Sequence, residues 1–234
     1  EYDKLMSVIG AEGTNAYTST DMTVYVEDIP SNQIENWARV EADRFMNPVL
    51  RGFHTELETV YEEKNMSLTK DFRKALEAMD GMLFPDHPYG TQTVLGTQEH
   101  LKNPSITNIK NYQKTYYVPN NIAICLSGDF DPDEMVAVIE KYFGQMQPNK
   151  DLPEITLATS SVIESPVEKD VYGLDAENIM IGWKYPGAKS EDALVAEVAA
   201  SVLYNGSAGL IDLNINQQQK VLGAYGMSYG RPDA

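Results

Sequence analysis

Two glutamates on one predicted helix are the residues in this sequence best placed to do chemistry. Glu56 and Glu63 stand seven positions apart, which is about two helical turns, so their carboxylates share one face. The apolar residues Leu57, Val60 and Tyr61 recur at helical spacing and predict a buried opposite face. Two stacked carboxylates can complete a metal site whose other ligands lie elsewhere. The simpler interpretation is a solvated acidic face.

Further segments surround this helix in a particular order. The strand-like segment Gly13–Tyr25 precedes the helix, and the loop His87-Pro88-Tyr89-Gly90 follows it. The Asn-rich segment Tyr116–Ile124 comes next and leads to Gly128-Asp129. Together with the Glu-x(6)-Glu helix, this ordered set resembles the insulinase/pitrilysin family of zinc metallopeptidases, the inverzincins. The resemblance covers nearly all of residues 1–234.

The resemblance implies roles for four residues. Glu63 would be the third zinc ligand, and Glu56 a supporting carboxylate that orients a ligand of the metal. Asn15 and Ala16 would belong to the edge strand that receives an extended peptide through main-chain hydrogen bonds. The alternative is an ordinary edge strand protected by Thr and Asp. The implied activity is zinc-dependent hydrolysis of peptides or small unfolded proteins by the intact parent.

The signature that would supply the rest of the zinc site is absent from residues 1–234. In inverzincins, His-x-x-Glu-His provides two ligands and the general base. Here the histidines are His54, His87 and His100, and none lies within five positions of another. We therefore expect no catalytic residue in this chain, a general-base Glu upstream, and Zn²⁺ bound by the parent but not by this inactive internal fragment. We expect His87 to form hydrogen bonds within its loop, and the other two histidines to lie on the surface.

The amino-acid composition indicates which classes of partner this chain can bind. The net charge of −17 argues against nucleic acid and anionic membranes, and favours cationic peptides. No apolar run approaches the length of a membrane span. The single cysteine, Cys125, excludes an intrachain disulfide, and its apolar neighbours predict a buried thiol. The resemblance to the insulinase/pitrilysin family implies two partners, a peptide substrate and a second family-type repeat or subunit that closes the active-site chamber. The sequence names no compartment, and we lean toward the bacterial cell envelope or periplasm.

Hydrophobic periodicity predicts an α+β fold with a mixed, mainly antiparallel sheet and helices packed on one face. The family resemblance implies that residues 1–150 form the peptidase-like repeat without its first strand and signature helix, and that 166–234 form the truncated start of a second similar repeat. Residues 151–165 are predicted to be a linker. Strands are expected over 15–20, 23–26, 122–127, 178–185 and 225–229. Helices are expected over 1–9, 31–47, 55–80 with Gly81 as the stop, from Ser105, from Asp131, from Ser190, and over 210–221.

Two rival interpretations stay open. A non-catalytic module of the same family, serving as a peptide-binding or partner subunit, would keep the sheet and edge strand but lack metal. Retention of both Glu56 and Glu63 speaks against it, because a metal-free subunit needs neither. An unrelated acidic peptide-binding domain would require the ordered motifs to coincide by chance.

Overall fold

The structure is a computed structural model that describes residues 2–154, 156 and 158–232. Residue 1 of the predicted first helix, positions 155 and 157 of the predicted linker, and residues 233–234 lie outside the described residues. The chain forms two compact units, and each combines two stretches of sequence. Unit 1 comprises Glu1–Met66 and Val94–Glu154, and unit 2 comprises Ser67–Thr93 and Ile155–Ala234.

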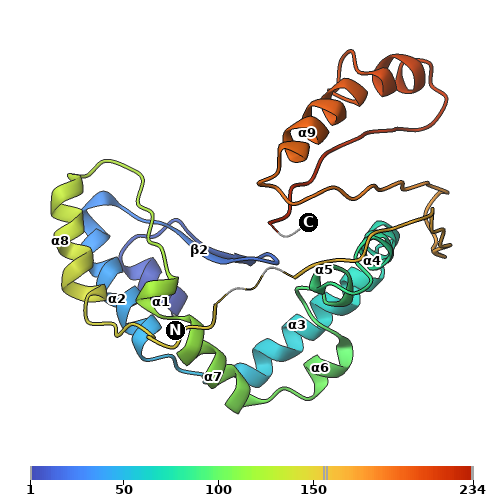
Figure 1. The fold of residues 1–234 in the computed structure, drawn as a ribbon. Helices are drawn as coiled ribbons and strands as arrows, with labels where there is room; N and C mark the ends of the chain where they lie inside the picture. The colour runs from blue at the N-terminus through green and yellow to red at the C-terminus, as the bar shows by residue number, and fades with distance from the viewer. Residues whose placement is uncertain (1, 155, 157, 233–234) are drawn as a thin grey trace. The chain divides into compact units, whose positions relative to one another are not determined.

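Helices dominate both units (Figure 1). Unit 1 contains α1 (Tyr2–Val8), β1 (Gly13–Thr18), β2 (Thr23–Asp28), η1 (Ser31–Gln33), α2 (Ile34–Met46), most of α3 (Phe53–Leu68), α6 (Gln98–Lys102), α7 (Ile106–Tyr116), η2 (Pro119–Asn121) and α8 (Pro132–Phe143). Unit 2 contains α4 (Asp71–Leu83), α5 (Pro88–Thr91), α9 (Glu191–Leu203) and the π-helical turn η3 (Asp212–Asn216).

The core of unit 1 lies between α1, α2 and α8. Its buried residues are Met6, Ile34, Trp37 and Ala38, and the apolar face of α8 packs against them. The Trp37 ring lies 6.2 Å from that of Phe143, measured between centroids. Figure 1 shows α8 running alongside α2, as this packing requires. One apolar face of each of these helices therefore builds the core.

Three predicted helix starts are confirmed by their capping hydrogen bonds. The Ser105 side chain accepts a hydrogen bond from the Asn108 amide at 3.2 Å, which begins α7. Asp131 accepts from two amides in the first turn of α8, and Pro132 occupies the first helical position. Ser190 caps α9 in the same way. Each cap satisfies amides that the first turn leaves without a partner inside the helix.

The fold is α+β, with a small antiparallel sheet. Strands β1 and β2 pair over six positions, from Gly13 opposite Asp28 to Thr18 opposite Thr23. The strands predicted over 122–127, 178–185 and 225–229 are not strands in the described residues. Their apolar side chains favour extended backbone, but a strand also requires a neighbouring strand to pair with it. Cys125 is exposed, so the prediction of a buried thiol was wrong, because this segment belongs to no sheet in the described part of the chain.

The helix predicted over 55–80 is interrupted. Helix α3 ends at Leu68 and α4 begins at Asp71, with Lys70 in an extended conformation between them. Gly81 is not the stop, since α4 continues to Leu83. The predicted helix over 210–221 was also too long: after a short helical start, the π-helical turn ends at residue 216.

Helix α5 packs closely against the end of α4 in unit 2. A Cβ added at Gly90 would lie 2.1 Å from the Phe84 carbonyl oxygen and 2.5 Å from that of Asp80. The predicted His-Pro-Tyr-Gly loop is therefore the start of helix α5, and its fourth position requires glycine because two backbones approach closely there. Helix α5 is capped by His87, whose Nδ1 accepts a hydrogen bond from the Tyr89 amide at 3.1 Å.

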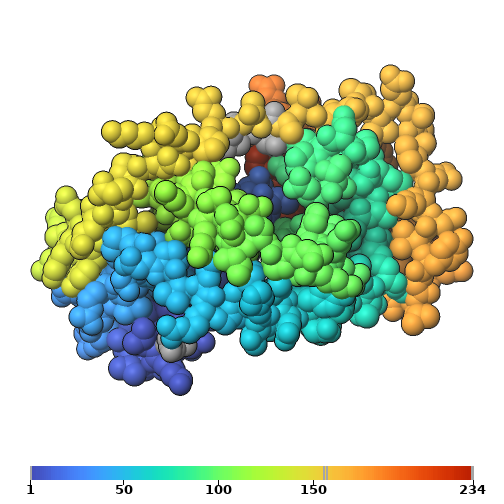
Figure 2. Space-filling model, turned by 90° about the horizontal axis from the view of Figure 1, so that it is seen from below, coloured from blue at the N-terminus to red at the C-terminus, as the bar shows by residue number. Residues whose placement is uncertain are grey.

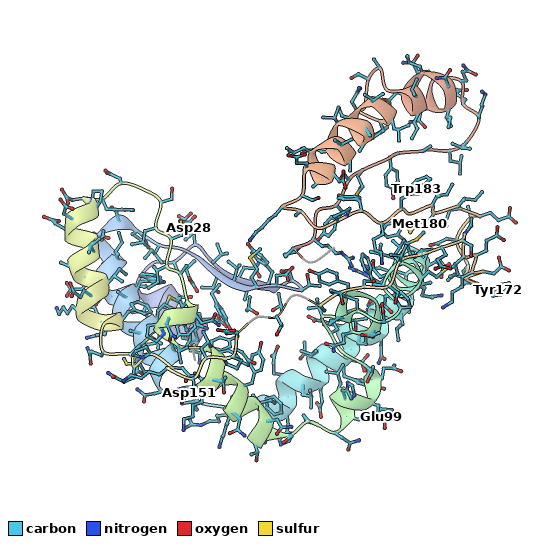
Figure 3. The ribbon with its side chains drawn as sticks, in the orientation of Figure 1. Asp28, Glu99, Asp151, Tyr172, Met180 and Trp183 are labelled. Carbon is cyan, nitrogen blue, oxygen red and sulfur yellow. The ribbon has the colours of Figure 1, made fainter. Side chains whose placement is uncertain are left out.

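Three aspartates in the segment 71–86 bind the later part of unit 2. The contacts are Asp175 amide to Asp71 at 2.8 Å, Arg231 Nη2 to Asp80 at 2.8 and 2.9 Å, and Ser161 amide to Asp86 at 3.1 Å. Much apolar surface in this part stays exposed, including Tyr172 and Trp183, which Figure 3 labels. None of the helices in the described part of the chain is long and apolar enough to cross a bilayer.

Candidate functional site

Helix α3 carries both glutamates that the sequence singles out. It begins after Gly52, whose φ of 78° turns the chain into the helix. Glu56 and Glu63 both lie on α3, and both are exposed. The residues predicted to form the opposite face are only half-buried. One of them, Tyr61, lies 5.5 Å from Lys102 Nζ of α6, measured to the ring centroid.

Strand β1 presents the predicted peptide-receiving edge. All six of its residues are exposed, and within the described residues it pairs only with β2. Asn15 stands opposite Val26, and Ala16 opposite Tyr25. The Asn15 side-chain oxygen accepts a hydrogen bond from the Ala16 amide at 2.8 Å. An incoming strand that used this amide would therefore first have to displace the side chain of Asn15.

The described residues do not complete a metal site. No group of three His, Cys, Asp or Glu side chains within residues 2–154, 156 and 158–232 is arranged to hold a metal ion. Glu56 and Glu63 offer carboxylate oxygens, whereas a zinc peptidase site combines histidine nitrogens with a carboxylate. The residues present therefore fit part of a zinc site and not a whole one.

The three histidines are placed as predicted. His87 is buried, with 1% of its surface exposed, and forms the hydrogen bond that caps α5. His54 and His100 are exposed. His87 therefore forms the local hydrogen bond predicted for it, although its partner lies in helix α5 and not in a loop.

A charged cluster that was not predicted from the sequence lies beside the β1–β2 hairpin. Arg44 of α2 binds the carboxylate of Glu41, which is 2% exposed, and lies 4.0 Å from the Glu27 carboxylate of β2. Burial raises the pKa of the Glu27 carboxyl, and a hydrogen bond from Tyr2 opposes this rise. The sequence contained one signal of this cluster, an i,i+3 Glu–Arg pair on the helix face that also carries Ala38.

The sequence of this chain matches a known protein family and several of its members. The family model described as "Peptidase M16 inactive domain" matches residues 105–232. A probable mitochondrial-processing peptidase subunit beta of Schizosaccharomyces pombe is 28% identical over 138 residues, which are 58% of this chain and 30% of that protein. The zinc protease PqqE of Helicobacter pylori is 23% identical over 239 residues, covering 94% of this chain and 51% of that protein.

The fold also matches a solved structure. The alignment with a crystal structure of a protease from Helicobacter pylori covers all of this chain and 58% of that protease chain. The TM-score is 0.75 and the sequence identity is 20%. Because the family model matches more than half of the residues, this chain belongs to the M16 family of insulinase-type zinc metallopeptidases. It spans about a third to a half of the length of the curated relatives described above.

Proposed function

We propose that this chain is part of a zinc-dependent metalloendopeptidase that hydrolyses peptides or small unfolded proteins. The observation that carries the proposal is the pair Glu56 and Glu63, which α3 exposes in the unit that also presents the exposed strand β1. Membership of the M16 family supports it, as does the zinc protease from Helicobacter pylori that aligns with 94% of the chain.

Within that protein, we assign Glu63 as a zinc ligand and Glu56 as a carboxylate that orients the ligands around the metal. Two histidine ligands and the general base would come from residues outside 1–234. This chain alone is then inactive and holds no stoichiometric zinc, because a single carboxylate ligand binds zinc weakly.

The substrate would bind to strand β1 as an added strand. Main-chain hydrogen bonds to residues such as Asn15 and Ala16 would hold it, so that many sequences could be accepted. The charge of −17 favours peptides that carry positive charge. A second family-type repeat or a partner subunit would close the chamber around the bound peptide.

We also propose that the complete protein builds a larger, mainly antiparallel sheet with helices on one face, and that residues 166–234 begin its second repeat after a linker at 151–165. Support comes from the alternation of Ile179, Ile181 and Trp183, which are all exposed here. Three apolar residues at every second position share one face of an extended segment, as a strand that packs on a helix requires.

A second candidate is a non-catalytic partner subunit of the same family. One specific observation favours it: the family model that matches residues 105–232 describes an inactive domain. Under this alternative, β1 still binds a peptide, but Glu56 and Glu63 are merely solvated.

The test uses the full-length protein that contains this chain. We expect Glu63→Gln to abolish stoichiometric zinc and peptide cleavage together, because the amide retains the size but loses the anionic ligand. Glu56→Gln should lower activity on the order of tenfold to a hundredfold. Glu62→Gln is the matched control, since Glu62 is exposed on the same helix about 100° away from Glu63.

The readouts are zinc content by mass spectrometry and cleavage of an unstructured, labelled peptide. Full activity in the Glu63→Gln protein would refute the ligand assignment. A wild-type protein that holds no zinc and cleaves no peptide would favour the partner-subunit alternative.

A further inference from the structure

Arg44 connects helix α2 to the β1–β2 hairpin. Its Nε donates hydrogen bonds to the two carboxylate oxygens of Glu41 at 3.2 and 3.1 Å, and Nη2 donates to the same carboxylate. Nη2 also lies 4.0 Å from Oε1 of Glu27 on strand β2. The side chains of Glu41 and Glu27 are 2% and 8% exposed, so water screens these charges little.

The guanidinium also lies over three aromatic rings. Its carbon is 4.7 Å from the ring centroid of Tyr2 on α1, 4.5 Å from that of Tyr25 on β2, and 4.9 Å from that of Phe45 on α2. Such distances allow cation–π attraction, which is stronger where the cation is desolvated. Arg44 therefore contacts α1, α2 and β2 simultaneously. We call Arg44, Glu41, Glu27, Tyr2, Tyr25 and Phe45 the Arg44 cluster.

The other members of the Arg44 cluster contact one face of strand β2 through Tyr25 and Glu27. Tyr25 and Glu27 are two positions apart, so both side chains point to the same side of the strand. The Tyr2 hydroxyl donates to Glu27 at 2.8 Å, and the Tyr25 hydroxyl lies 3.2 Å from that of Tyr117, just beyond α7. Gln113 of α7 in turn donates to the Phe45 carbonyl oxygen at 3.0 Å, and α7 and α2 form adjoining surface in Figure 2.

Strand β1 is positioned mainly by β2, and Thr14 adds one hydrogen bond to Asp3 of α1 at 3.4 Å. All six residues of β1 pair with β2, and none of them is buried against a helix. Any movement of β2 relative to α2 would therefore move the free edge that carries Asn15 and Ala16. A peptide that adds to an already ordered edge loses less free energy to ordering than one that must order the edge as it binds.

We propose that Arg44 is a positioning residue, which holds the β1–β2 hairpin against α1 and α2 so that the β1 edge is ordered before an extended, cationic peptide binds. The inference rests on the proposed peptide-binding role of β1. It adds a residue that acts through β2 and does not touch the peptide.

The experiment must separate positioning from loss of the fold. Arg44→Met keeps an unbranched side chain but leaves the buried Glu41 carboxylate without its cation, which can unfold the unit. The double variant Arg44→Met/Glu41→Gln removes that charge together with the guanidinium. Lys141→Met is the matched control, because it deletes the exposed Lys141–Glu35 ion pair of α8 and α2.

Two measurements on the full chain give the answer. Hydrogen exchange followed by mass spectrometry compares peptides covering residues 13–28 with peptides covering 132–143. Fluorescence anisotropy measures binding of a labelled probe, Lys-Val-Thr-Lys-Val-Thr-Lys. In the double variant we expect exchange in the hairpin to rise on the order of tenfold while α8 stays protected, and probe affinity to fall with it. The control should change neither quantity.

Each remaining outcome has a definite meaning. Unchanged hairpin exchange in the folded double variant would overturn the proposal. Weaker probe binding without faster hairpin exchange would also overturn it, because Arg44 would then act on the peptide directly. If the wild-type chain binds no probe but the hairpin still loosens, the peptide-binding function fails while the structural link from Arg44 to the hairpin stands.

Discussion

Two glycines that face each other in unit 2 should respond oppositely to the same substitution. Gly81 lies inside α4, and a Cβ there would meet only the Gly90 carbonyl oxygen, at an ordinary 3.7 Å. Gly90 lies in α5, where a Cβ would be 2.1 Å from the Phe84 carbonyl oxygen. We expect Gly81→Ala to stabilise the protein and Gly90→Ala to destabilise it.

The magnitudes follow from two competing effects. Replacing a helical glycine by alanine raises the free energy of unfolding by about 0.5–1 kcal/mol, because alanine has less backbone freedom to lose on folding. Nearly all of this increase should be observed at Gly81. At Gly90 the neighbouring carbonyls belong to backbone and must move by about 1 Å to reach van der Waals contact, and overpacking of this kind costs about 1–3 kcal/mol or more. The clash should therefore exceed the helix-propensity gain, leaving Gly90→Ala less stable than wild type.

Urea unfolding followed by circular dichroism measures the free energy of unfolding of both variants. Because the chain has two units, hydrogen exchange of peptides covering residues 71–92 should accompany it, to show that the change lies in unit 2. A Gly90→Ala protein as stable as Gly81→Ala would refute the close approach of α5 to the end of α4.

Three further predictions concern the cap of α8, the edge strand β1 and the ionisation of Asp71. Asp131→Ala should lower the free energy of unfolding by about 1 kcal/mol, whereas Asp131→Asn should nearly preserve it, as measured by urea titration. Asn15→Ala should speed amide exchange at Ala16 by about two- to tenfold, measured by NMR, because the amide loses its acceptor. The hydrogen bond from Lys74, with backbone amides, lowers the pKa of Asp71 to about 2. Since the folded pKa lies below the unfolded one, this stabilisation is present above about pH 4 and is lost as pH falls through about 2, and Asp71→Asn should remove that dependence from acid melting curves.

Features fixed by neighbours in the sequence could be predicted. Ser105, Asp131 and Ser190 cap helices because each side chain bonds to an amide two or three positions further on. The shared location of Glu56 and Glu63 on one helix also follows from spacing alone. The sequence therefore predicted correctly that both carboxylates lie on one helix, while their role as ligands stays a prediction.

Features fixed by distant contacts could not be predicted. The break between α3 and α4 contains neither glycine nor proline. At the start of α4, Asp71 accepts hydrogen bonds from the amides of Leu174 and Asp175, about a hundred positions away. Arg44 shows the same limit: the Glu41–Arg44 pair is visible in the sequence, but its contact with Tyr25 depends on how the hairpin packs.

The way unit 2 is assembled has a consequence for cleaved forms of the protein. The segment 67–93 and the segment 155–232 belong to one compact unit although unit 1 residues separate them in sequence. Asp71, Asp80 and Asp86 on the first segment bind groups on the second. A single peptide-bond break near residue 155 would thus leave these noncovalent contacts in place. Residues 1–154 and 155–234 made as separate polypeptides should therefore reassociate, which makes the chain suited to fragment complementation.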